Sequence, residues 1–211
     1  MNNIRFLPPE LKSVVGAERI EFSVFGKRNE PASNSIGIIF FGTFWTAITS
    51  IFVVAFLGSF FEGGKFNFGV NGIPTSGNWE NFAPILVPVF IIGLFVLIGI
   101  GMLSWGFYSF FKKGGYFVGT ATRLIRYNKG IIHSYDWEQF SGNMEINNKK
   151  GDITLQLRTG KMVSRKNSSS QFVPDIVYIS GVTNVLEIEK ICRTRIKEND
   201  PTPATNSGFF S

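Results

Sequence analysis

The stretch FFKKGGYFVGTATRLIRYNKG (residues 110–130) changes character within four residues. It begins as the end of a long apolar segment and passes Lys112, Lys113, Gly114 and Gly115. It then continues as half-polar sequence rich in residues that favour strands. Lysines after an apolar segment are typical of a chain leaving a membrane, and a change to period two is typical of a sheet. The stretch therefore separates a membrane part from a folded part.

Two segments before this point carry no charged residue. Residues 36–61 are charge-free over 26 positions, and residues 82–111 over 30. About 20 apolar residues are enough to cross the hydrocarbon core of a bilayer as a helix. The sequence therefore predicts a hairpin of two transmembrane helices, joined by the loop 62–81.

The flanking charges predict the orientation of this hairpin. Residues 1–35 contain five lysines and arginines, whereas the loop 62–81 contains only Lys65. Lys112 and Lys113 follow the second span. The positive-inside rule therefore places both termini in the cytoplasm and the loop outside.

The composition limits the function classes. Residues 112–211 carry 15 Lys/Arg against 9 Asp/Glu, which favours an anionic partner, either nucleic acid or a membrane surface. The two spans favour the membrane, and no aromatic and basic stripe indicates nucleic acid binding. Cys192 is the only cysteine, so the chain has no internal disulfide and no cysteine metal cluster.

The cytoplasmic part, residues 116–199, reads as strands followed by one helix. In GDITLQLRTG (151–160), apolar and polar residues alternate, as they do in a half-buried strand. Turn signals lie at 128–130 and 148–152, and further strands are expected near 117–127, 131–138, 140–147, 160–164 and 171–179. The tail, residues 200–211, has the composition of disorder.

A helix is expected after Asn184, because Glu187 follows it at the spacing of a capping box. An apolar stripe then runs along one face of this helix. Its members are Val185, Ile188, Cys192 and Ile196.

The segment TATRLI (120–125), the strand that follows it and the final helix resemble bacterial pleckstrin-homology-like domain proteins with two transmembrane helices. The segment GAERIEFSVFGKR (16–28) is similar to the element that often precedes the spans in that family. The resemblance implies a multi-pass protein of a bacterial inner (cytoplasmic) membrane, of the α+β class. Its cytoplasmic part would be a small β-barrel or sandwich of six to seven strands, closed by a C-terminal helix. It also implies a binding or scaffold module without shared catalytic residues.

Residues 19–25 have two possible structures. Apolar Ile20, Phe22 and Val24 alternate with more polar neighbours, which predicts an additional strand of the sheet. The alternative is an interfacial helix over 10–25, with Leu11 among the residues on its apolar side.

No motif for catalysis or cofactor binding occurs in the sequence. His133 has Asp136 and Glu138 nearby, but strand geometry turns these carboxylates to the opposite face. We therefore expect no enzymatic activity, no metal and no cofactor.

Basic residues are the better candidates for a site that binds lipid headgroups or a protein partner. The alternative is that they only satisfy the positive-inside bias and keep the domain soluble. The candidate basic face consists of Lys112, Lys113, Arg123, Arg126, Lys149, Lys150, Lys161, Arg165 and Lys166.

Small residues in the spans allow helices to approach closely, either within the hairpin or with a partner. The candidate packing positions are Gly42, Thr46, Ser50, Gly93, Gly99 and Gly101.

Three functions fit these features. The first is a membrane-tethered module for protein binding or self-assembly, with a membrane protein or a second copy as partner. The second is a sensor of anionic lipids, and the third is an accessory subunit of a transport or export complex.

Overall fold

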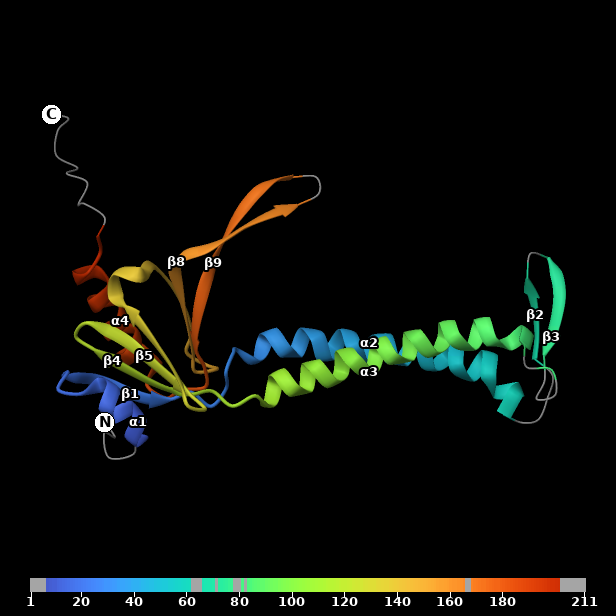
Figure 1. Ribbon diagram of the computed structural model, residues 1–211, viewed down its shortest axis with the longest axis horizontal. Helices are drawn as coiled ribbons and strands as arrows, with labels where there is room; N and C mark the ends of the chain where they lie inside the picture. The colour runs from blue at the N-terminus through green and yellow to red at the C-terminus, as the bar shows by residue number, and fades with distance from the viewer. Residues whose placement is uncertain are drawn as a thin grey trace. The chain divides into compact units, whose positions relative to one another are not determined.

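The computed structural model describes residues 7–61, 66–70, 72–77, 81, 83–165 and 168–201. The chain divides into two compact units (Figure 1). Residues Ala32–Phe111 form one unit, which we call the helix-pair unit. Residues Met1–Pro31 and Lys112–Ser211 form the other, which we call the sheet domain. The sheet domain is thus assembled from both sides of the helix-pair unit in the sequence.

The helix-pair unit contains two long helices, α2 (Ala32–Phe61) and α3 (Leu86–Phe111). Both are long and apolar enough to span a membrane. Between them, β2 (Phe66–Val70) and β3 (Ile73–Gly77) form an antiparallel hairpin, and the short 3-10 helix η2 (Ala83–Ile85) precedes α3. The sequence analysis had not anticipated this hairpin within the loop 62–81.

Helices α2 and α3 pack antiparallel, with small residues at their contact. A Cβ atom on Gly99 would lie 2.7 Å from Thr46 Oγ1, and one on Gly42 would lie 3.1 Å from Leu103 Cδ2. A Cβ on Gly106, which the sequence analysis had not singled out, would lie 2.7 Å from Ile39 Cγ1. The two backbones therefore approach each other where side chains are absent or small.

The other three candidate packing positions lie elsewhere. Ser50 is exposed, whereas Thr49 is buried. Two helical turns take about seven residues, so Thr49, and not Ser50, lies on the same side of α2 as Gly42. An added Cβ on Gly93 or Gly101 would have no heavy atom of the described residues within 4 Å, apart from the adjoining backbone of its own helix. These two glycines are open to a partner or to lipid.

Several polar side chains of α2 form hydrogen bonds within the helix pair. Thr46 Oγ1 donates to the carbonyl oxygen of Gly42 at 2.8 Å, and Thr49 Oγ1 donates to that of Trp45 at 2.8 Å. The indole Nε1 of Trp45 donates to the carbonyl oxygen of Phe95 across the helix contact at 3.0 Å, and the two rings stack. This arrangement suits a hydrocarbon environment, where an unpaired polar group costs several kcal/mol.

The described part of the sheet domain has seven strands in two antiparallel sheets. The first sheet has the order β1-β4-β5-β6, and the second has the order β7-β8-β9. The strands are β1 (Ile20–Phe25), β4 (Tyr116–Thr120), β5 (Arg123–Asn128), β6 (Ile131–Asp136), β7 (Phe140–Asn147), β8 (Asp152–Arg165) and β9 (Ser168–Ile179). The sequence analysis left a small barrel and a sandwich open. The described strands form two separate sheets and no closed barrel, because the chain leaves the first sheet through the 3-10 helix η3 (Trp137–Gln139) and begins a second one.

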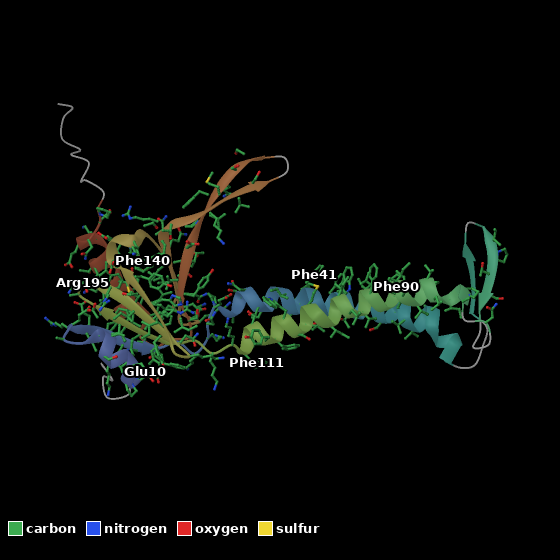
Figure 2. All side chains as sticks on the ribbon, in the orientation of Figure 1. Glu10, Phe41, Phe90, Phe111, Phe140 and Arg195 are labelled. Carbon is green, nitrogen blue, oxygen red and sulfur yellow. The ribbon has the colours of Figure 1, made fainter. Side chains whose placement is uncertain are left out.

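The main core lies among the two sheets and α4 (Val185–Glu198). Trp137, Phe117 and Phe140 are the largest fully buried side chains, and Trp137 Nε1 donates to the carbonyl oxygen of Thr120 at 2.9 Å. Figure 2 shows Phe140 among the crowded side chains of this domain. The predicted stripe of α4 is buried in full, at Val185, Ile188, Cys192 and Ile196.

The opposite face of the first sheet is covered by α1 (Pro9–Val15). Leu11 and Val15 of this helix pack against Val118 and Ile125 of the sheet. The strand predicted for residues 19–25 is therefore confirmed, because residues 20–25 form a strand paired with β4. The alternative of an interfacial helix over 10–25 is wrong, because the helix ends at Val15 and packs on the sheet. The helix covers the sheet instead of continuing to residue 25.

Two local expectations differ from the structure. The segments 151–160 and 160–164 belong to one long strand, β8, whose far half pairs with β9 alone (Figure 1). The capping box at α4 is absent, because Asn184 has a left-handed backbone (φ 61°) and its side chain makes no capping hydrogen bond. An N-cap residue normally has an extended backbone conformation, and its side chain accepts a hydrogen bond from a backbone N–H in the first turn of the helix.

A test of the helix contact compares two glycines of α3. Gly99→Val should lower the stability of the helix pair by about 1–3 kcal/mol, because the new side chain collides with Thr46. Gly93→Val, in open space, should change it by less than about 0.5 kcal/mol. Thermal unfolding of the purified chain in detergent measures both, and equal losses would contradict the described contact.

Candidate functional site

Arg123, the first residue of β5, is committed to an internal ion pair. Its Nε donates to Glu18 Oε1 at 3.0 Å, and its Nη2 contacts the same carboxylate and the carbonyl oxygen of Val14 at 3.2 Å. The side chains of Arg123 and Glu18 are each 28% exposed. This arginine joins β5 to the N-terminal segment and is not a free basic group.

Two threonine hydroxyls complete the environment of Glu18. Thr120 Oγ1 and Thr122 Oγ1 donate to Glu18 Oε2 at 2.7 and 2.9 Å. The hydrogen bond from Arg123, the strongest influence, lowers the pKa of Glu18 below its ordinary value, against the opposing effect of burial. The two sequence elements that carry the family resemblance, 16–28 and 120–125, therefore meet in one polar network.

Arg126 lies on the opposite face of the same sheet from Arg123. In a strand, residues three apart point to opposite sides, so these two arginines do not form one surface. Arg126 Nη2 donates to Asn29 Oδ1 at 2.7 Å, and its guanidinium lies 5.6 Å from the centre of the Phe117 ring. This arginine also stabilises the domain internally.

The remaining candidate bases lie on three other segments. Lys112 and Lys113 are exposed directly after α3, and Lys149 and Lys150 are exposed in the turn between β7 and β8. Lys161 is exposed on β8, and Arg165 is the last residue of that strand. Lys166 lies outside the described residues. The predicted basic face is thus distributed over four places in the sheet domain.

The far halves of β8 and β9 form a two-stranded ribbon, residues 160–165 and 168–174, which we call the β8–β9 arm. It extends beyond the rest of its sheet (Figure 1). Four of its apolar side chains are between 43% and 66% exposed: Met162, Val163, Phe172 and Val173. The sequence analysis missed this surface, although two adjacent apolar residues on each strand already indicate a ribbon that is apolar on both faces.

A shallow cavity of about 360 Å³ lies between β1 and α4. Beside it, Arg195 holds Glu21 through two guanidinium contacts, and this carboxylate raises the pKa of Arg195. Figure 2 labels Arg195 at this position on α4. The cavity is lined by a structural ion pair that joins β1 to α4.

Side chains that could together hold a metal ion do not gather in the part of the chain that the structure describes. No cluster of three or more His, Cys, Asp or Glu side chains occurs there. The ring of His133 stacks on Tyr135, two residues along the same face of β6, at 6.3 Å between ring centres.

No protein-family model matches this chain, and no curated protein matches it. The resemblance to bacterial pleckstrin-homology-like domains therefore rests on the quoted residues and remains a proposal.

The Glu18 network predicts a stability that depends on pH. Because the pKa of Glu18 is lowered by folding, its contribution is complete above the unfolded pKa of about 4.3 and is lost as the pH falls through the folded value. Glu18→Gln should therefore destabilise the sheet domain by about 1–3 kcal/mol at pH 7. The difference from the wild-type chain should shrink below about pH 4.

Thermal unfolding midpoints at pH 7 and at lower pH measure this effect. Glu145→Gln, at an exposed position of β7, is the matched control and should leave the midpoint unchanged. Coinciding midpoints for Glu18→Gln and the wild-type chain at pH 7 would show that the network does not stabilise the fold.

Proposed function

We propose that this chain is an integral protein of a bacterial inner membrane that presents a non-enzymatic interaction domain to the cytoplasm. The domain would bind a membrane protein or a second copy of the chain. The main support is the pairing of β1 with β4, the two strands that flank the apolar helices in the sequence.

This pairing restricts the topology. Phe25 is opposite Tyr116, and Val24 is opposite Phe117, so the segments before and after the helix pair share one sheet. Further hydrogen bonds join Arg28 N to Ser180 O and Asn29 N to Lys112 O. A sheet cannot form across a bilayer, so residues 20–25 and 116–120 must lie on the same side of any membrane that the helices span.

The charges support the cytoplasmic side. Lys112 and Lys113 are exposed next to the end of α3, where the positive-inside rule places basic residues on the cytoplasmic side. The loop 62–81 contains a single lysine and two glutamates.

An interaction role is supported by the way the polar side chains are used. Two ion pairs join parts of the domain to each other. Arg123 of β5 pairs with Glu18 of the N-terminal segment, and Arg195 of α4 pairs with Glu21 of β1. The β8–β9 arm, in contrast, presents uncovered apolar side chains, which commonly mark a surface that contacts either a protein or a membrane. Tethering to the membrane raises the effective concentration of such a surface for partners in the same plane.

The fold supports the proposed membership of the pleckstrin-homology-like family. Seven strands in consecutive order, closed by the C-terminal helix α4, agree with what the resemblance implies. The helix pair falls between the first and second strands of this domain. In such a protein the sheet would be a binding scaffold without its own catalytic residues.

Topology reporters test this proposal. A reporter that is active only in the cytoplasm should be active after residue 211 and inactive within the loop 62–81, and the chain should resist extraction by alkaline carbonate. A periplasmic location for the C-terminal fusion would overturn the proposal. Chemical cross-linking in membranes, followed by affinity purification, should then recover a membrane protein or a dimer of this chain.

A further inference from the structure

The β8–β9 arm is apolar on both faces. Met162 is directly opposite Phe172 across the two strands, so these side chains share one face. Val163 and Val173, the next residues along each strand, point to the other face. The exposed fractions are 66% for Met162 and 49% for Phe172. Such a ribbon gains little stability alone, because isolated two-stranded hairpins are marginal in water.

The charges of the arm favour an anionic partner. Residues 160–174 contain Lys161, Arg165 and Lys166 but no aspartate or glutamate. Two arms from two copies would therefore bring like charges together. An anionic phospholipid surface supplies the opposite charge, and its interface also accepts apolar side chains next to basic ones.

The membrane is also the surface that this chain reaches most readily. Two helices of the same chain are long and apolar enough to span it, so the sheet domain would be tethered at the bilayer. Under that condition even a small apolar surface can remain bound, because tethering makes the contact intramolecular.

We propose that the β8–β9 arm inserts Met162, Phe172 and their apolar neighbours into the headgroup boundary of an anionic bilayer. The arm is then a second attachment of the sheet domain, besides the helix pair. This inference rests on the membrane anchoring proposed above. It assigns the bases of the arm to lipid phosphate.

The test places an environment-sensitive fluorophore on Phe172→Cys in the full chain, reconstituted in nanodiscs of phosphatidylglycerol and phosphatidylcholine. Cys192 should not compete for the label, because burial raises the pKa of its thiol to about 12. Lys197→Cys, exposed on α4, is the matched control position. Lipids that carry a quencher near the headgroup should quench the label at residue 172 at least about 3-fold more than the label at residue 197.

Two further variants separate the apolar and electrostatic contributions. Met162→Asp should reduce the lipid quenching at residue 172 to that of the control position, whereas Met162→Leu should preserve it. Replacing phosphatidylglycerol by phosphatidylcholine, or both Lys161 and Arg165 by glutamine, should weaken the quenching by at least about 2-fold. All of these positions are in the arm, so the substitutions leave the core intact.

Two outcomes would overturn the proposal. One is a label at residue 172 that aqueous iodide quenches as strongly as the label at residue 197. The other is efficient disulfide cross-linking of two Phe172→Cys chains, which would assign the arm to a second copy. Extraction of the chain by carbonate would overturn the membrane anchoring itself, so that failure is distinguishable from failure of the arm contact.

Discussion

The pairing of β1 with β4 is the constraint on which the rest of the structure depends. The two strands are separated in sequence by the whole helix-pair unit, yet they are hydrogen-bonded neighbours. Closing a long flexible loop costs conformational entropy. Here the antiparallel helices reduce that cost, because the contact of Ile39 with Gly106 holds the start of α2 near the end of α3. Packed helices generally lie about 8–10 Å apart and neighbouring strands about 4.8 Å apart. Short connections are therefore enough to lead from β1 into α2 and from α3 into β4.

Strand β1 also explains how one sheet can contribute side chains to two hydrophobic cores. A bulge at Glu21 changes the register between Ile20 and Phe22, so Ile20 packs toward α1 while Phe22 enters the main core. Glu21, the residue at the bulge, forms the ion pair with Arg195 on α4. Because both faces of the sheet are covered, β4 reads as nearly continuous apolar sequence and does not alternate.

Features set by local chemistry could be predicted from the sequence. The two apolar helices follow from charge-free length, the buried stripe of α4 follows from its spacing, and the turn after Asn128 follows from Lys129 and Gly130, both with positive φ. Features set by distant partners could not be predicted. Nothing near Arg123 indicates that Glu18, 105 residues away, holds it. Whether seven strands close into a barrel or form two sheets depends likewise on long-range pairing.

The different use of arginine and lysine indicates what kind of surface the sheet domain presents. Arginine supplies the base in its ion pairs, as in Arg123 with Glu18 and Arg195 with Glu21. A planar guanidinium suits such fixed, two-point contacts with carboxylates. The exposed bases directly after α3 and in the turn between β7 and β8 are lysines, at Lys112, Lys113, Lys149 and Lys150. Lysine is a mobile, strongly hydrated point charge, so this distribution favours diffuse attraction to an anionic surface over a pocket shaped for one headgroup.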